Sequence, residues 1–340
     1  MISVDTIKDA QWIHFLDRNR NATIYHTPKW KDFLQETFGY KPFYIFLKND
    51  SDELVGLLPF FYVRSKITGN RISCLPFAHE CGYIGETKGS NSVLINQILQ
   101  LNDRLDPDFI EIRAPIEGIF QESQIYSTYI LRLDALEQGV SSVSYGVEKN
   151  VRRSIQKAQK LGVSVEVSSD DDDIKYFYEL NCLNKRSLGV PAHPLKFLAN
   201  LRRILNGNAR LYISKFNSEI VGCGLMIYYK DTVLYGYGAA HPGRLRLHPY
   251  HAILWKAILD ASSEGYKRFD FGRVSRENTG LANFKKRWGS TEKILKYSSY
   301  PNPLKSNRSG LKYRLGTRFL KKTPLPVYKI TSNLIFRNFG

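Results

Sequence analysis

The chain has 340 residues, of which 43 % are hydrophobic, 13 % aromatic and 24 % charged, and its formal net charge is +17. This composition excludes disordered and collagen-like chains, and the length suits two domains of ordinary size or one large one. The longest apolar runs, such as Gly56–Val63, are far shorter than the roughly 18 residues of a membrane-spanning helix. The first residues lack the basic leader and apolar stretch of a secretory signal, so we expect a cytoplasmic protein without transmembrane segments.

The first half of the chain contains a helix with well-marked ends. Thr27 and Pro28 suit the cap and the first turn of a helix that carries Trp30 and Phe33. Gly39 then supplies its end.

The second half begins with an amphipathic helix over residues 145–161. Val151, Ile155 and Ala158 share one face of this helix, lysines and arginines occupy another, and Gly162 supplies a left-handed stop. We place the boundary between the two halves just before it, in the stretch Gln138–Gly146 that is rich in glycine and serine.

Alternating and helical patterns continue through the second half. In chain order they predict a strand over 163–167, a helix opened by the acidic run 170–173, a helix near 194–206, strands near 210–215, 219–229 and 232–239, a helix from His248-Pro249 to Gly265, a strand over 267–271 and a last strand near 293–299. This order of elements is typical of a GNAT-like acyltransferase domain.

Three short segments of the first half recur in the same order in the second half. They are Glu53–Gly56 with Glu219–Gly222, Ala78–His79 with Ala240–His241, and Phe109–Arg113 with Phe269–Arg273. Each match alone is at the level of chance, but the offsets drift by only six residues. We therefore predict an α/β protein with mixed sheets, in which two tandem GNAT-like domains, 1–140 and 141–300, precede a basic tail, 301–340.

The segment Phe269–Gly289 carries the most distinctive chemistry. A strand delivers Asp270 and Arg273 to its carboxyl end, where open α/β sheets gather ligands, and a short helix then presents Lys285 beside aromatic residues. A lysine in this place could hold a phosphate or neutralise the oxyanion of acyl transfer. The alternative is a solvated basic helix with a buried Phe284 and Trp288.

The FDFG strand followed by the pattern G-L-x-x-F-K-x-x-W-G resembles the FemABX family, tandem GNAT-like transferases related to the enzymes that build peptidoglycan interpeptide bridges. The basic segment Asn150–Gly162 is similar to the segment that opens the second domain of the family. Arg186–Pro194 and Leu247–Trp255 are similar to a FemAB-like branch associated with envelope and exopolysaccharide loci. The resemblance extends from about Tyr25 to Tyr300.

The resemblance implies an enzyme that transfers an acyl group to an amine. Bridge-forming members take an amino acid from aminoacyl-tRNA and attach it to the peptide stem of a cell-wall precursor. Lys285 matches the family lysine at the acyl-transfer site, so we expect it to be catalytic. Asp270 and Arg273 would orient substrate or Lys285, or form a structural ion pair. The pair Gly272-Arg273 replaces the two glycines frequent in bridge-forming members, which leaves the acceptor open.

Further candidates line up on the basic helix and on one strand. The cations Arg152, Arg153 and Lys157 suit a polyanion such as a pyrophosphate or an RNA backbone, and a solvated helix face is the alternative. Tyr237 lies on a strand where its phenol could return a proton to the leaving group, although core packing is the commoner role of such a tyrosine. His241 and Arg186 complete the predicted substrate-binding residues.

The acyl donor remains open between aminoacyl-tRNA and acyl-CoA, used as a co-substrate without a tightly bound cofactor. Gly243–Pro249 lacks the second glycine of the usual acetyl-CoA loop, which weakens classical CoA binding. Residues 170–210 leave no room for an inserted helical arm that binds tRNA. We expect the acceptor to be a nucleotide-linked or lipid-linked envelope precursor, either a peptidoglycan stem peptide or an exopolysaccharide amino sugar.

The tail 301–340 contains nine lysines and arginines and no acidic residue. Its apolar residues alternate with these cations, which suits peripheral contact with the inner face of an anionic membrane and nearly as well a solvated tail packed on the second domain. The four cysteines lack the spacing of zinc ligands or disulfides, so we expect buried thiols and no metal.

Two rival functions remain beside aminoacyl or acyl transfer. One is CoA-thioester-dependent N-acylation of an amino sugar. The other is a basic module that keeps the fold but only binds RNA or membrane, which would show affinity that falls steeply with salt and no product with any donor.

Overall fold

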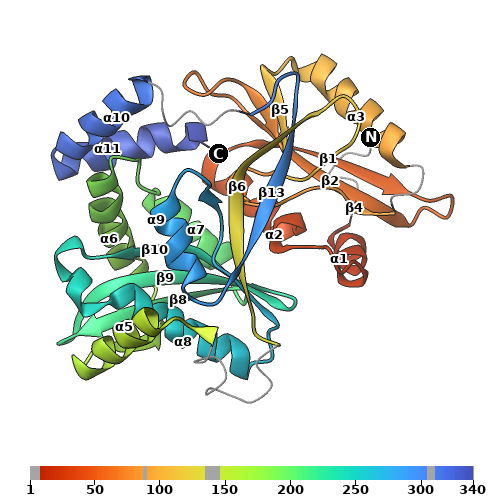
Figure 1. Ribbon diagram of the computed structural model, residues 1–340. Coiled ribbons are helices and arrows are strands. Elements are labelled where there is room, and N and C mark those ends of the chain that lie inside the picture. Colours follow the sequence, from red (N-terminus) through yellow and green to blue (C-terminus); the bar gives the residue numbers. More distant parts are fainter. Residues whose placement is uncertain (1–7, 87–89, 135–145, 305–310, 340) are drawn as a thin grey trace. The chain divides into compact units, whose positions relative to one another are not determined.

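The computed structural model describes residues 8–86, 90–134, 146–304 and 311–339 (Figure 1). The chain forms two compact units. Unit 1 comprises residues 1–126, 294–306 and 337–340, and unit 2 comprises residues 127–293 and 307–336. The expected domain boundary at 138–146 lies almost entirely outside the described residues.

Unit 1 is a mixed sheet with helices. Its elements in chain order are α1 (Asp9–Arg18), η2 (Ile24–His26), α2 (Pro28–Phe38), β1 (Lys41–Lys48), β2 (Leu54–Val63), β3 (Arg71–Ser73), β4 (Ile84–Gly85), α3 (Ser90–Leu105) and β5 (Phe109–Ile112), with η5 (Arg337–Phe339) near the end of the chain. Strand β6 (Gln121–Arg132) passes from unit 1 into unit 2.

Unit 2 follows the order of elements expected from the sequence. The elements are α5 (Lys149–Lys160), β7 (Ser164–Val167), α6 (Asp173–Leu188), α7 (Leu195–Ile204), β8 (Ala209–Phe216), β9 (Glu219–Tyr229), β10 (Thr232–Ala240), η3 (Pro242–Leu247), α8 (Pro249–Ser263), β11 (Arg268–Asp270), β12 (Val274–Ser275), α9 (Thr279–Lys286), α10 (Leu311–Lys322) and α11 (Leu325–Phe336). Strand β13 (Thr291–Tyr300) passes from unit 2 back into unit 1.

Local sequence signals explain where the helices end. The Thr27 side chain accepts a hydrogen bond from the amide of Trp30, Pro28 opens α2, and Gly39 closes it in the left-handed conformation. Helix α5 is followed by Gly162, whose φ of 82° suits glycine. Both ends agree with the predictions from the sequence.

The two units repeat one strand topology. In unit 1, β1 and β2 pair antiparallel, β2 and β3 pair antiparallel, and β3 and β5 pair in parallel. In unit 2, β8 and β9, β9 and β10, and β10 and β11 pair in the same three ways. The predicted duplication of a mixed α/β unit is therefore visible in the strand pairing.

Each unit borrows its next strand from the other half of the sequence. In unit 1, β5 pairs antiparallel with the Ser298–Tyr300 end of β13. In unit 2, β11 pairs antiparallel with Ile130–Arg132 of β6. The compact units therefore depart from the predicted ranges 1–140 and 141–300, because two strands cross between them, and α10 and α11 of the expected tail belong to unit 2.

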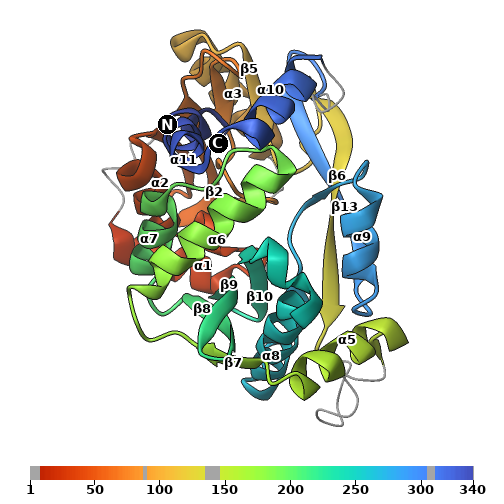
Figure 2. The same ribbon diagram turned by 90° about the vertical axis from the view of Figure 1, so that its left-hand side faces the viewer.

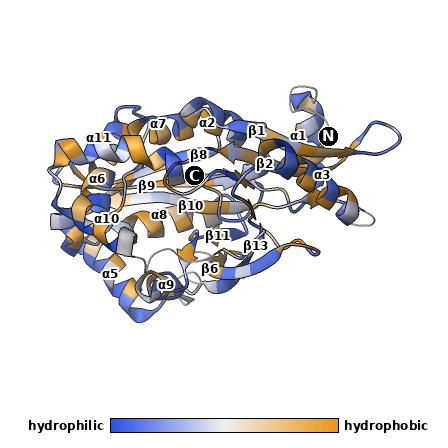
Figure 3. Ribbon diagram, turned by 90° about the horizontal axis from the view of Figure 1, so that it is seen from above, coloured by the Kyte–Doolittle hydropathy of each residue, from blue (hydrophilic) through white to orange (hydrophobic). Residues whose placement is uncertain are grey.

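The sheet of unit 2 is covered on both faces. Figures 2 and 3 show β8, β9 and β10 between α6 and α7 on one side and α5 and α8 on the other. Met226 and Tyr228 of β9 pack with Ile253 and Leu254 of α8 in one buried cluster that also contains Trp288. This packing fixes the strands that carry the candidate site.

All four cysteines are free thiols and are buried, as expected. Within the described residues, none of the helices combines the length and the apolar character that crossing a membrane requires.

Candidate functional site

The carboxyl ends of β10 and β11 are the framework of the site in unit 2. The two strands pair in parallel only where Thr232–Leu234 lie beside Arg268–Asp270, and β10 then continues to Ala240. Tyr235 and Tyr237 pair with consecutive residues of β9, so Gly236 between them is the extra residue of a β-bulge. Ligands of open α/β sheets gather at such strand ends.

Asp270 is a buried carboxylate at the end of β11, with 7 % of its surface exposed. Its Oδ1 atom accepts hydrogen bonds from the hydroxyl of Thr128 on β6 and from the amide of Gly272, the latter at 2.8 Å. Two donors on one oxygen fix the orientation of the carboxylate.

Lys285 is brought to the same strand end by α9. The side chain of Asn278 caps this helix by accepting from the amide of Leu281. Lys285 is only 4 % exposed, and its Nζ donates to the carbonyl oxygen of Gly272 at 2.6 Å and to that of Arg273 at 3.4 Å. The third N–H of the ammonium finds no acceptor among the residues that the structure describes.

Burial changes the titration of this lysine. Desolvation lowers the pKa of Lys285 to about 8, and the negative charge of Asp270 opposes part of that shift. The side chain therefore stays mainly protonated at neutral pH, inside the protein rather than in bulk water. An enclosed cation with a spare donor can stabilise a developing oxyanion.

The bulge at Gly236 separates the two tyrosines of β10. Tyr235 packs with the α8 side of the sheet, where its ring covers Gly238. The half-buried Tyr237 instead packs edge-on against the rings of His193 and Phe197, with centroids 4.9 and 5.2 Å away. Residues two apart in a regular strand share a face, so the extra residue sends the two phenols to opposite faces.

His193 was not among the predicted site residues, although it lies in the segment quoted for the family resemblance. Its Nδ1 lies 2.9 Å from Oδ1 of Asn181, and Nδ2 of Asn181 donates to the His193 carbonyl oxygen. Because an amide oxygen only accepts, Nδ1 carries the proton. Desolvation lowers the pKa of His193 well below 6.5, so the ring is neutral.

The basic helix α5 of unit 2 turns its cations toward solvent. Arg153 and Lys157 are exposed and Arg152 is half-buried, while the apolar face of the helix is buried. Desolvation lowers the pKa of His248, the residue before α8, and the positive charge of Lys157 adds to that shift. Nε2 of His248 is buried and finds no hydrogen-bond partner among the described residues.

Three predicted binding residues have individual environments. Arg186 is half-buried, and its Nε donates to the carbonyl oxygen of Thr323 at 2.7 Å, which gives it a structural partner in the loop between α10 and α11. His241 is exposed and caps η3 by accepting from the amide of Gly243. Arg273 is exposed beside the Lys285 site.

In the described part of the chain, no group of three or more His, Cys, Asp and Glu side chains is arranged to hold a metal ion.

Comparisons with known proteins agree with this architecture. A family model described as an acetyltransferase (GNAT) domain matches residues 146–286. The crystal structure of FemX matches with a TM-score of 0.69 at 16 % identity, over 86 % of this chain and 96 % of FemX. No curated protein matches the chain in sequence.

Two further solved structures share the fold. A tandem GNAT protein from the clavulanic acid biosynthesis pathway matches with a TM-score of 0.53 at 11 % identity, over 88 % of this chain and 96 % of that one. The C-terminal domain (DUF2156) of a protein assigned as a lysylphosphatidylglycerol synthetase from Agrobacterium fabrum matches with a TM-score of 0.55 at 10 % identity, over 87 % and 93 %. The chain thus shares the fold of FemX and of a tandem GNAT protein, and its residues 146–286 match the acetyltransferase (GNAT) domain family.

Proposed function

We propose that the protein transfers an aminoacyl or acyl group to an amine of a cell-envelope precursor and so forms an amide. The observation that carries this proposal is the buried ammonium of Lys285, held at the end of β11 with one N–H unused among the described residues. FemX, whose fold the chain shares, supports the acyl-transfer class.

The reaction would need few protein groups. The amine nitrogen attacks the acyl carbon, a C–N bond forms, and the C–O bond of an ester or the C–S bond of a thioester breaks. The attacking amine loses one proton and the leaving oxygen or sulfur gains one. In our proposal Lys285 stabilises the oxyanion of the tetrahedral intermediate, and the fixed carboxylate of Asp270 keeps Lys285 protonated.

Tyr237 is the proposed source of the proton for the leaving group. The neighbouring rings of His193 and Phe197 both pack edge-on against its ring, which would limit the positions of the phenol. In this scheme His193 is a positioning residue, and Asn181 in turn orients it.

The donor is proposed to enter with its phosphates toward α5. Aminoacyl-tRNA and acyl-CoA both carry phosphates, and Arg152, Arg153 and Lys157 supply cations on α5, while the amino end of α8 itself favours anions. Arg273, exposed beside Lys285, is proposed to contact the acceptor. His241, which precedes the segment Gly243–Pro249 at the position of the usual acetyl-CoA loop, is proposed to contact the donor. Both donors are cytoplasmic molecules, so we propose a cytoplasmic reaction.

One observation favours acyl-CoA as the donor. The family model that matches residues 146–286 is described as an acetyltransferase domain. CoA-dependent N-acylation of an amino sugar is therefore the second candidate, with the same roles for the residues of the site.

A product assay tests the proposal. The protein is incubated with charged tRNA and, in parallel, with acyl-CoA, together with nucleotide-linked and lipid-linked peptidoglycan or exopolysaccharide precursors, and products are weighed by mass spectrometry. We expect an acceptor heavier by one aminoacyl or acyl group with one donor. If no donor gives a product while the protein binds nucleic acid or vesicles, the protein is a binding module and the proposal is wrong.

A further inference from the structure

Helices α10 and α11 of unit 2 form a hairpin with an apolar outer face. The large apolar side chains on this face are between 50 % and 69 % exposed, and they are Leu315, Phe319, Val327, Ile330 and Leu334. We call these five residues the outer face. They recur at spacings of three and four residues within each helix, so they form a continuous stripe rather than scattered contacts.

The opposite side of the hairpin is firmly packed on unit 2. Leu320 and Tyr328 are buried in a cluster with Cys182 of α6. The hydroxyl of Tyr328 donates to the carbonyl oxygen of Val190, and Nζ of Lys329 lies 2.6 Å from a carboxylate oxygen of Glu179. The inner side therefore has its partners, and the orientation that these contacts fix leaves the outer face exposed.

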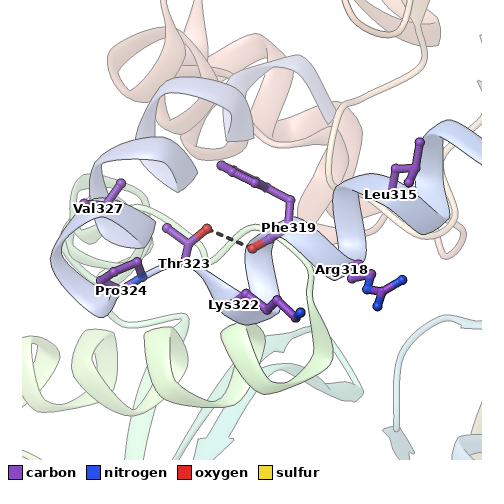
Figure 4. Close-up of a pocket in the computed structure, with 7 residues that line it drawn as sticks. All are labelled: Leu315, Arg318, Phe319, Lys322, Thr323, Pro324 and Val327. Atoms are coloured by element: carbon purple, nitrogen blue, oxygen red, sulfur yellow. Dashed lines mark hydrogen bonds between the residues drawn. The ribbon is translucent and has the colours of Figure 1, made fainter.

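A hollow opens between the two helices on the outer side (Figure 4). Its volume is about 450 Å³, and its lining residues are Leu315, Arg318, Phe319, Lys322, Thr323, Pro324 and Val327. The cations Arg318 and Lys322 thus line the same hollow as the apolar side chains. Residues 301–340 contain no acidic side chain that could pair with them.

We propose that the outer face binds the surface of a membrane that contains anionic phospholipids. Apolar side chains of such a helix enter the boundary between headgroups and acyl chains, and lysines and arginines beside them reach the lipid phosphates. The charged side chains that line the hollow, Arg318 and Lys322, are both positive. An anionic membrane matches this single sign of charge, whereas the surface of a partner protein generally carries both signs. The inference goes beyond acyl transfer and does not depend on it.

Vesicle flotation of the whole chain tests this proposal. Vesicles of phosphatidylcholine with phosphatidylglycerol are compared with vesicles of phosphatidylcholine alone, at low and high salt. We expect binding to the anionic vesicles, weakened by salt, and at least a tenfold loss in a variant with F319Q, I330Q, R318Q and K322Q, since each cation near the surface contributes about fivefold. These side chains are exposed, or line the open hollow, so the variant is expected to fold.

A matched control carries I13Q, I67Q, R20Q and K66Q. It also replaces two exposed large apolar side chains, one arginine and one lysine by glutamine, at positions of unit 1, and it removes the same charge. We expect it to bind the anionic vesicles like the unmodified protein. Equal losses in both variants, or no binding by the unmodified protein, would overturn the proposal. So would a dimer in solution that only the outer-face variant converts to a monomer, because a second copy would then be the occupant.

Discussion

Two opposing effects set the protonation of Lys285. Removing the ammonium from water favours the neutral amine, and the carboxylate of Asp270 favours the cation. The resulting pKa of about 8 keeps the proton at neutral pH, yet it lies within reach of ordinary buffers. The chemistry proposed for this residue can therefore be tested by titration as well as by substitution.

Replacing Lys285 by methionine is expected to lower kcat about 100-fold to 1000-fold, because a donor to the oxyanion is lost. The measurement is steady-state product formation, with circular dichroism to verify folding. The control is K286M, which removes an exposed neighbouring lysine and should change kcat little. Unchanged turnover in folded K285M protein would refute the catalytic role.

The same lysine predicts a pH dependence of stability. Its pKa in the folded state, about 8, lies below the ordinary value of 10.5, so between these values the unfolded chain binds more protons. The free energy of unfolding should therefore increase as pH rises through this window, by less than about 1.4 kcal/mol per pH unit. Urea unfolding at several pH values should show that contribution in the unmodified protein and not in K285M.

Replacing Asp270 by asparagine should shift the pH profile of the rate. The carboxylate raises the pKa of Lys285, so its loss lowers that pKa below about 8. The fall in kcat on the alkaline side should then begin at lower pH. The T128V variant, which removes the hydroxyl that Asp270 accepts from but keeps the charge, is the control. An alkaline limb that stays in place in D270N would contradict the coupling.

At the scale of single elements, the bulge in β10 has the largest effect on the site. Tyr235 and Tyr237 are two residues apart, and a regular strand would present both phenols on one face. Because of the extra residue at Gly236, Tyr235 packs on the face covered by α8, and Tyr237 packs against the ring of His193. Strand periodicity in the sequence could not distinguish them, because a bulge is set by pairing with a distant strand.

Helix α5 yields a prediction about donor binding. Neutralising Arg153 and Lys157 to glutamine should raise the KM for the donor about tenfold and reduce its salt dependence, with little change in kcat, since both cations are exposed and act through charge. Initial rates at varied donor and salt concentrations give the result. The control is K175Q, an exposed lysine of α6. A fall in kcat at constant KM would contradict a role in donor binding.

At the scale of the whole molecule, the crossing strands tie each unit to the other half of the sequence. The end of β13 completes the sheet of unit 1 beside β5, and its Tyr297 donates from its hydroxyl to the carbonyl oxygen of His79. Unit 1 therefore depends on residues that follow their partners in β5 by 186 to 190 positions in the chain.

Shortening the chain tests this dependence. A chain that ends at residue 290 lacks β13, so β5 loses a strand partner and its amides should exchange with solvent faster. A chain that ends at residue 306 keeps β13 and loses α10 and α11, and it is the control. Hydrogen exchange followed by mass spectrometry measures both. Equal protection of β5 in the two chains would show that unit 1 does not need β13.

Local signals in the sequence determined the helices, the order of strands and the duplication. Thr27, Gly39 and Gly162 act on their own neighbours, so their effects need no knowledge of the fold. The family motif also identified Lys285 as the residue to examine. These features are local in the chain or are repeated in it.

The tertiary structure decided what the local patterns left open. It paired β5 with β13 and β11 with β6, separated Tyr235 from Tyr237, gave Arg186 a partner in Thr323, and joined His193 to Asn181. It also buried Lys285 against the Gly272 carbonyl. The physical reason is the same in each case: the partners are brought together by folding, and strand pairing, desolvation and hydrogen bonding depend on which groups meet in space.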